Sequence, residues 1–236
     1  MPTSLTHTRH LPSNQQPSVA DGVNSTRFGQ NVGPAALAIG AITVVAGMAL
    51  HPTGNNEGAL VPYISSHLAR WGWTHIILAT GFMMLAMGMC SVLGLATGPR
   101  GTRLITIGAV TGSVGSVLFA WETVAHGAVM QAIASRRLPP DQALQVAKHY
   151  VETPYFVPFS AAASLFLPLG LVLLGIAMIR SRRIPTWAAV VLTLSPVGVQ
   201  VGGAAGPRML VAGIPLIVGS TALARAVQQS RGHVGA

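Results

Sequence analysis

Charge is scarce in this sequence. Only 8% of the 236 residues are Asp, Glu, Lys or Arg, whereas 50% are hydrophobic and the mean hydropathy is +0.56. A water-soluble domain carries charge on about a quarter of its residues. So few charged side chains cannot cover a surface that faces water on all sides, and they favour a protein surrounded by lipid.

Cysteine and the common catalytic motifs are also lacking. Cys90 is the single cysteine, which excludes an intrachain disulfide and argues against a thiolate-bound metal cluster. The sequence contains no glycine-rich phosphate loop, no H-E-x-x-H and no G-x-S-x-G. No internal repeat relates two halves of the chain, which weighs against an ordinary secondary transporter.

Long apolar stretches are what the sequence does contain. They comprise residues 32–50, 76–97, 104–121, 156–179, 184–205 and 209–224. A helix of about 20 apolar residues spans the hydrocarbon layer and satisfies its own backbone hydrogen bonds there. Turn-forming sequences such as Gly98-Pro99 and Gly206-Pro207 separate the stretches. The predicted fold is therefore all-α: a polytopic integral membrane protein with a six-helix transmembrane bundle over residues 32–227.

The two ends of the chain are predicted to lie on the same side of the membrane, because the number of spans is even. Residues 1–31 are rich in Ser, Thr, Asn, Gln and Pro, so we expect a disordered cytoplasmic tail. Residues 228–236 form a second, short cytoplasmic tail.

Arginines set the predicted orientation in the cell membrane. Nine of the 14 Lys and Arg residues fall on the side of the two tails, namely Arg9, Arg27, Arg100, Arg103, Arg180, Arg182, Arg183, Arg225 and Arg231. Excess Lys and Arg mark cytoplasmic loops, so both termini are expected in the cytoplasm. The net charge of +9 then reflects topology and attraction to lipid headgroups, and no nucleic-acid partner is expected.

The opposite, extracytoplasmic side collects most of the acidic residues and histidines. Four of them lie where predicted helices begin or end: His51 closes the first, His75 opens the second, and Glu122 with His126 closes the third. Spacings of three and four residues place these groups on stripes of small residues, such as Gly40 and Gly47 before His51 or Gly108, Gly112 and Gly115 before Glu122. Small residues mark close helix contacts in membranes, so the four side chains are predicted to face inward at one depth.

This cluster admits several chemistries. Zinc, copper or iron could be bound by His51, His75 and His126, with Glu122 as a fourth ligand or as the group that orients one imidazole. Two of the same imidazoles could instead hold a b-type haem. Glu122 and His126 could also act without a cofactor, as catalytic acid and base on a lipid or isoprenoid substrate.

Less specific roles stay open beside these. The chain could be an accessory subunit that packs its glycine-rich faces against a larger membrane complex. A histidine at a helix end commonly bonds water or a carbonyl group, and Glu122 could form a structural ion pair with His126 or Arg208. A pocket that binds a transition metal or a b-type haem, with a redox role among its uses, is the leading hypothesis; cofactor-free acid–base catalysis is the alternative, and an accessory subunit is the second alternative.

Other polar residues carry weaker signals. His67 lies in an aromatic segment with Tyr63, Trp71 and Trp73, which is typical of the membrane interface. Residues 139–152 predict a short amphipathic helix capped by Asp141 that lies over the outer face, with His149 and Glu152 in solvent. Other candidates for the cavity are Gln200, as a lining residue, and Pro168, Pro196 and Pro215, as kinks that open space.

Overall fold

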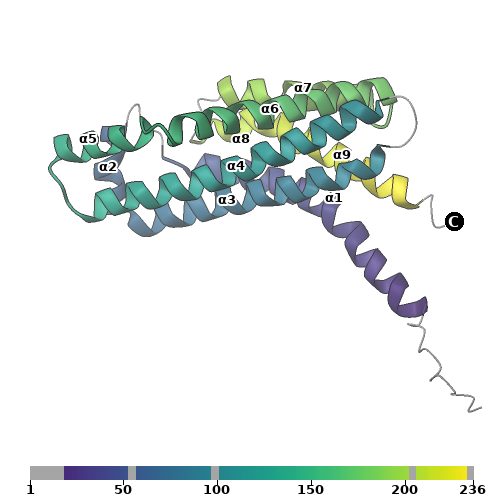
Figure 1. Cartoon of the computed structure of the whole chain (residues 1–236), viewed down its shortest axis with the longest axis horizontal. Coiled ribbons are helices and arrows are strands. Elements are labelled where there is room, and N and C mark those ends of the chain that lie inside the picture. The colour runs from purple at the N-terminus through teal and green to yellow at the C-terminus, as the bar shows by residue number, and fades with distance from the viewer. Residues whose placement is uncertain (1–18, 53–56, 97–100, 202–205, 233–236) are drawn as a thin grey trace, which may run out of the picture.

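The computed structural model describes residues 19–52, 57–96, 101–201 and 206–232, and all regular secondary structure in these ranges is helical (Figure 1). The elements are α1 (Val19–Leu50), α2 (Glu57–Ser66), α3 (Leu68–Ser91), η1 (Val92–Leu95), α4 (Thr102–Ser135), α5 (Pro140–Val151), α6 (Phe156–Ser181), α7 (Thr186–Val201), α8 (Met209–Ala212) and α9 (Ile214–Gly232). The all-α prediction is confirmed for these residues.

Five helical segments of the described chain are long and apolar enough to cross a membrane. They are Asn31–Leu50, Leu68–Leu95, Thr102–Ser135, Phe156–Ser181 and Met209–Ser230. The predicted fifth span, residues 184–205, corresponds to α7, whose apolar part Thr186–Val197 is shorter. Residues 202–205 of this predicted span lie outside the described part of the chain. The structure therefore indicates a multi-pass membrane protein, with five such segments in place of the six expected.

The chain enters its first helix earlier than predicted. α1 begins at Val19, so residues 19–31 of the predicted disordered tail are helical; residues 1–18 lie outside the described part. The first turns of α1 extend away from the bundle (Figure 1). Helix propagation adds one hydrogen bond for each residue fixed, so an apolar helix can continue into a polar segment. At the other end α9 runs to Gly232, and residues 233–236 lie outside the described part.

Glycines let neighbouring helices approach backbone to backbone. A Cβ atom added to Gly40 of α1 would lie 2.7 Å from the backbone nitrogen of Leu85 in α3, and one added to Gly108 of α4 would lie 2.9 Å from that of Leu174 in α6. Such distances leave no room for a side chain. The small-residue stripes therefore face other helices, α3 for the α1 stripe and mainly α6 for the α4 stripe.

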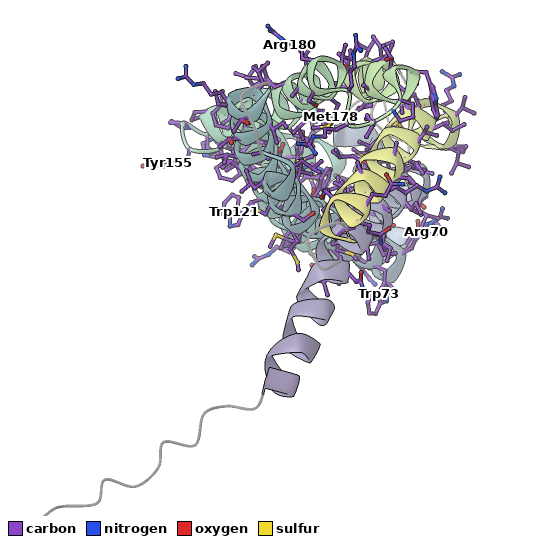
Figure 2. The ribbon with its side chains drawn as sticks, turned by 90° about the vertical axis from the view of Figure 1, so that its right-hand side faces the viewer. Arg70, Trp73, Trp121, Tyr155, Met178 and Arg180 are labelled. Atoms are coloured by element: carbon purple, nitrogen blue, oxygen red, sulfur yellow. The ribbon has the colours of Figure 1, made fainter. Side chains whose placement is uncertain are left out.

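The outer surface of the bundle carries large exposed side chains. Trp73, Trp121 and Tyr155 point outward in Figure 2, whereas Met178 lies inside the bundle. Their exposed fractions are 64%, 59% and 88%, against 0% for Met178. An apolar surface of this kind suits contact with lipid, and Trp and Tyr favour its interfaces with water.

The buried apolar residues fall into two clusters. The bundle cluster joins α1, α3, α4, α6, α7 and α9 and includes Leu37, Leu85, Leu174 and Leu192. The cap cluster joins α2 and α5 to the first turns of α3 and the last turns of α4; its buried members are Leu60, Val61, Ile64, Trp71, Met130, Ile133, Ala134, Ala143 and Ala147. α2 and α5 lie at one end of the molecule (Figure 1).

The length of α4 explains why a cap exists. Its 34 residues span about 51 Å at 1.5 Å per residue, whereas the hydrocarbon core is about 30 Å thick. One end of α4 must therefore project beyond the hydrocarbon, and α2 and α5 cover the projecting part.

Candidate functional site

Three histidines from three helices meet at the boundary between the bundle cluster and the cap cluster. The ring centroids of His51 and His75 are 5.2 Å apart, and those of His75 and His126 are 5.9 Å apart. His51 directly follows α1, His75 belongs to α3 and His126 belongs to α4. The structure thus brings together the three imidazoles that the sequence singled out.

Their positions along the helices differ from the prediction. α3 begins at Leu68, well before His75, and α4 continues past Glu122 and His126 to Ser135. These three residues therefore lie within helices instead of at helix ends. The cap packs around the extended ends, so the helices continue beyond their most apolar stretches.

Trp71 borders the histidine cluster on the side of the cap and contacts two of its rings. Its side chain is fully buried, and its ring centroid lies 4.2 Å from His75 and 5.1 Å from His51. The indole Nε1–H donates a hydrogen bond to the carbonyl oxygen of Gly127, 2.9 Å away. The prediction that Trp71 lies in an interfacial aromatic segment is therefore wrong. Trp71 is a core residue that connects α3 to α4. The four-residue spacing from His75, which places both on one helical face, was the sequence signal for this role.

Gly127 makes room for the ring of His75. A Cβ atom at Gly127 would lie 2.6 Å from Cγ of His75, so any side chain there would displace the imidazole. The contact holds His75 between α3 and α4.

Backbone carbonyl groups fix the tautomers of two histidines. Nδ1 of His75 lies 2.9 Å from the carbonyl oxygen of Trp71, and Nδ1 of His51 lies 3.0 Å from that of Pro52. A carbonyl oxygen only accepts, so each Nδ1 is the donor and each neutral ring keeps a lone pair on Nε2. Burial lowers the pKa of His51 from its ordinary value of 6.5, and the bond to Pro52 opposes this shift. His51 is therefore neutral at pH 7.

Glu122 lies beside the histidines and is held by α6. The hydroxyl of Ser160 donates a hydrogen bond of 2.6 Å to Oε1 of Glu122, so this bond replaces the proposed ion pair with His126 or Arg208. Oε2 of Glu122 and the hydroxyl of Tyr150 are both buried without a hydrogen-bond partner in the described residues. Burial and the negative charge of Glu122 raise the pKa of Tyr150, which makes these two groups electrostatic neighbours.

Sequence reasoning missed Ser160 and Tyr150. A serine within an apolar helix commonly bonds its own backbone, and nothing in the α6 sequence distinguishes Ser160. Tyr150 belongs to the amphipathic α5, where a half-exposed aromatic residue is ordinary. Only the packing of α5 and α6 against α4 identifies them.

The cluster opens into a small cleft of about 180 Å³. Its lining comprises Met48, His51, His75, Leu78, Phe82, Phe119, Glu122, Thr123 and His126. An apolar chamber of about 60 Å³ adjoins it and shares the three lining residues Met48, Phe82 and Phe119. The rings of Phe82 and Phe119 are stacked with centroids 5.1 Å apart and lie between the polar and the apolar space. Pro168 and Pro196, two of the three prolines that the sequence suggested as helix kinks, line the chamber.

The described residues do not form a ready-made metal centre. No group of three or more His, Cys, Asp or Glu side chains in the described ranges is arranged to hold a metal ion. The imidazoles of His51, His75 and His126 are close, but their nitrogens do not converge on one point. No hydrogen bond joins the ring of His126 to another described residue.

The remaining polar candidates lie away from the cleft. The ring of His67 stacks on Tyr63 with centroids 4.5 Å apart, and this pair lies at the tip of the cap. His149 of α5 and Glu152, which directly follows α5, are exposed, as predicted. The side chain of Gln200 lies outside the described residues.

Comparison with known proteins gives no family assignment: no protein-family model, no curated protein and no solved structure matches this chain. The function must therefore be argued from the site.

Proposed function

We propose that the chain is a multi-pass cell-membrane protein that binds a divalent transition-metal ion through His51, His75 and His126. The observation that carries this proposal is the meeting of three imidazoles from three helices, with ring centroids 5.2 and 5.9 Å apart. Imidazole nitrogens bound to one zinc ion at about 2.0–2.1 Å place their ring centroids about 5 Å apart at tetrahedral angles. The ring spacing is therefore already close to that of a ligand set.

The hydrogen bonds of the first two histidines support the same assignment. Metal-binding histidines almost always donate their second ring N–H to a carbonyl or carboxylate, which fixes the tautomer that ligates. His51 and His75 each donate Nδ1–H to a backbone carbonyl. Their Nε2 atoms are left with the lone pairs that a metal ion needs.

Binding requires one ring to turn. Because no three side chains converge as they stand, an ion would recruit His126, whose ring has no hydrogen bond to lose within the described residues. The terminal torsion of a histidine side chain is broad and soft. Glu122 lines the same cleft, and its negative charge would offset that of the ion.

The size of the cleft favours an ion over haem. Pockets that enclose organic ligands have volumes of about 300–1,000 Å³, whereas the polar cleft measures about 180 Å³. A metal ion with one or two waters fits this space without opening the helices.

The proposed orientation places the histidines on the extracytoplasmic side and both termini in the cytoplasm. The short α6–α7 connection carries Arg182 and Arg183, as cytoplasmic loops do. If both termini lie in the cytoplasm, the number of membrane crossings is even. The sixth crossing must then be made by α7, which packs against α6 and α9.

Cysteine labelling tests this orientation. In a Cys90→Ala background, a membrane-impermeant maleimide added to intact cells should label Ser66→Cys at the cap and should not label Ser181→Cys before the α6–α7 connection. The reverse pattern would invert the topology.

Calorimetric titration with Zn²⁺ tests the metal site. The protein is purified with a tag that contains no histidine, and the tail residues His7, His10 and His233 are replaced by Gln in every sample. We expect one Zn²⁺ per chain. His75→Ala and His126→Ala should each weaken binding by about 100-fold or more, since even partners that only orient a ligand contribute 10–100-fold.

The chain offers matched controls for this titration. His67→Ala and His149→Ala remove histidines of the cap that lie outside the cleft, and they should leave Zn²⁺ affinity within about twofold. An equal loss of Zn²⁺ affinity in the site variants and the control variants would rule out the site. So would a parent protein that binds no stoichiometric Zn²⁺.

Glu122 supports a second candidate function, acid–base catalysis on a lipophilic substrate without a metal. Its Oε2 atom is buried and unpartnered, and the adjoining chamber is apolar. A substrate could place a polar head against Glu122 and the first carbons of an apolar chain in the chamber beyond Phe82 and Phe119.

Lipid turnover distinguishes this candidate from the metal site. The chain in nanodiscs of a total lipid extract should convert a component detectable by mass spectrometry, and Glu122→Gln should abolish the conversion. Thr123→Val, a change at a neighbouring lining residue, should preserve it. Unchanged conversion in Glu122→Gln, or conversion that depends on added Zn²⁺, would exclude cofactor-free catalysis by this carboxylate.

A further inference from the structure

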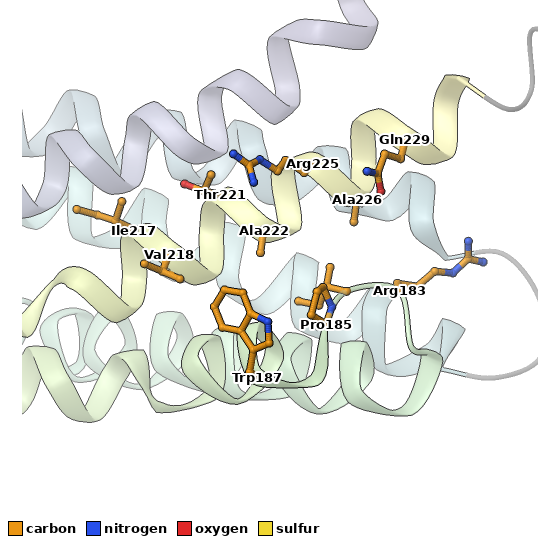
Figure 3. A pocket seen from close by; sticks show the side chains of 11 residues that line it. Arg183, Pro185, Trp187, Ile217, Val218, Thr221, Ala222, Arg225, Ala226 and Gln229 are labelled. Atoms are coloured by element: carbon orange, nitrogen blue, oxygen red, sulfur yellow. The ribbon is translucent and has the colours of Figure 1, made fainter.

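A second pocket lies at the other end of the bundle, between the start of α7 and the length of α9 from Ile217 to Gln229. Its volume is about 460 Å³, within the range of about 300–1,000 Å³ of ligand-binding pockets. It shares no lining residue with the histidine cleft. Figure 3 shows α9 along one wall, and the α6–α7 connection followed by Trp187 of α7 along the other.

The pocket exists because a large residue faces small ones. Trp187 stands on the α7 side and Ala222 on the α9 side. The side chain of Ala222 is a single methyl group, so it leaves empty space on the face of α9 opposite Trp187. Trp187 is 62% exposed, so its ring forms one open flank of the hollow.

Polarity changes along the pocket. Ile217 and Val218 lie at one end in Figure 3, Trp187 lies in the middle, and Arg183 lies at the opposite end. Arg225 of α9 is a second cationic lining residue, and the lining contains no acidic residue. The pocket therefore has an apolar end at Ile217 and Val218, one arginine at the opposite end, and a second arginine whose guanidinium lies beside Thr221.

We propose that this pocket binds one anionic phospholipid from the surrounding leaflet. The phosphate would lie between Arg183 and Arg225, whose long side chains would turn toward it, because guanidinium groups donate paired hydrogen bonds to phosphate oxygens. One acyl chain would follow Trp187 toward Ile217 and Val218. Basic pockets between transmembrane helices bind anionic headgroups in this manner. The absence of a carboxylate in the lining disfavours a zwitterionic lipid, whose ammonium group would find no partner there.

Quenching of tryptophan fluorescence measures this binding directly. The delipidated full chain in detergent is titrated with brominated phosphatidylglycerol, with brominated phosphatidylcholine of the same chains, and with inorganic phosphate as competitor. The difference between the parent and Trp187→Phe isolates the signal of Trp187. Phosphatidylglycerol should quench this signal at concentrations at least tenfold lower than phosphatidylcholine does, and phosphate at millimolar concentration should not compete.

One variant tests the arginines of the pocket, and another tests its apolar wall. Arg183→Gln with Arg225→Gln should weaken phosphatidylglycerol binding at least tenfold and leave phosphatidylcholine unchanged. Ala222→Leu adds a side chain to the space opposite Trp187 without changing the charge of the pocket. It should also weaken phosphatidylglycerol binding. Arg103→Gln with Arg180→Gln removes two exposed arginines that do not line the pocket and should change affinity less than twofold.

Several results would overturn the proposal. Equal affinity for the two lipids would show that the pocket does not select charge. An equal loss in the Arg103 and Arg180 control pair would show a diffuse effect of net charge. Effective competition by inorganic phosphate would show a phosphate site in place of a lipid site. Elution of each variant as a single folded species in size-exclusion chromatography keeps these outcomes separate from unfolding.

Discussion

The bundle cluster and the cap cluster are held together by different kinds of packing. In the bundle, glycines such as Gly40 and Gly108 bring helix backbones into contact, and large side chains such as Trp121 face outward. In the cap, the pattern is reversed: Trp71 fills the centre, and α5 is amphipathic with exposed charged residues. The bundle therefore packs through close backbone contacts, as membrane helices do, and the cap packs around large buried side chains.

This difference explains where the polar cluster lies. Within the bundle, the close backbone contacts leave little room for polar side chains from several helices. At the tip of the cap, water would surround them, as it does His149. His51, His75 and His126 meet at the boundary, where the helices still converge and the glycine contacts give way to side-chain packing. The boundary is therefore the place where buried polar groups can face one another.

The largest effect is expected from Trp71→Ala, which empties the cap cluster. Truncating a buried tryptophan costs about 3–5 kcal/mol, and the loss should fall on the cap alone. Limited proteolysis in detergent should cut α2 and α5 first while the bundle stays intact. Trp73→Ala, at a residue that is 64% exposed, is the control and should leave the digestion pattern unchanged. Simultaneous unfolding of both regions would show that they are one cooperative unit.

Gly115→Ala tests the packing of the bundle. A Cβ atom at Gly115 would overlap the backbone nitrogen of Leu167 in α6, and overpacking typically costs about 1–3 kcal/mol. The melting temperature in detergent should fall, whereas Val114→Ala on the exposed neighbour should change it little. Equal melting temperatures for Gly115→Ala and the parent would mean that α4 and α6 are farther apart than described.

Gly127→Ala should act on the site more than on stability. The added methyl group would displace the ring of His75, whose Cγ would lie 2.6 Å away, and Zn²⁺ affinity should fall by about 10–100-fold. Gly72→Ala is matched to it, because its Cβ would meet only the side-chain Oε1 of Gln131, 3.3 Å away. Titration calorimetry of both variants measures the difference. A Gly127→Ala protein with parental affinity would separate the position of His75 from metal binding.

The smallest effect is the pH dependence contributed by His51. Burial lowers its pKa in the folded state, so the unfolded chain takes up a proton first as the pH falls below about 6.5. Stability from this residue is complete at pH 7 and declines at lower pH, by no more than about 1.4 kcal/mol per pH unit. Melting temperatures of the metal-free parent should fall more steeply between pH 7.5 and pH 5.5 than those of His51→Gln. Parallel curves would place His51 in water.

The sequence predicted the membrane class and the residues of the cluster for a clear reason. Apolar stretches and the near absence of charge report directly on lipid surroundings, and the spacing of His51 and Glu122 from glycines reports the helix face. These signals are local in the chain and need no knowledge of packing.

The extent of the helices and the surroundings of the site could not be read in the same way. Hydropathy stops near Trp121, but α4 continues to Ser135 because α2 and α5 cover it. The burial of Trp71 and the bond from Ser160 to Glu122 depend on contacts between residues far apart in the chain.

X-ray absorption at the zinc edge tests the central claim most directly. The sample is the Zn²⁺-loaded full chain with the tail histidines replaced, and the control is the same protein with His75→Ala and His126→Ala. The account predicts imidazole nitrogens at about 2.0–2.1 Å from zinc, with the scattering of at least two imidazole rings, and loss of that signal in the double variant. A spectrum without imidazole scattering, or one identical in the double variant, would contradict a metal site at the junction of bundle and cap.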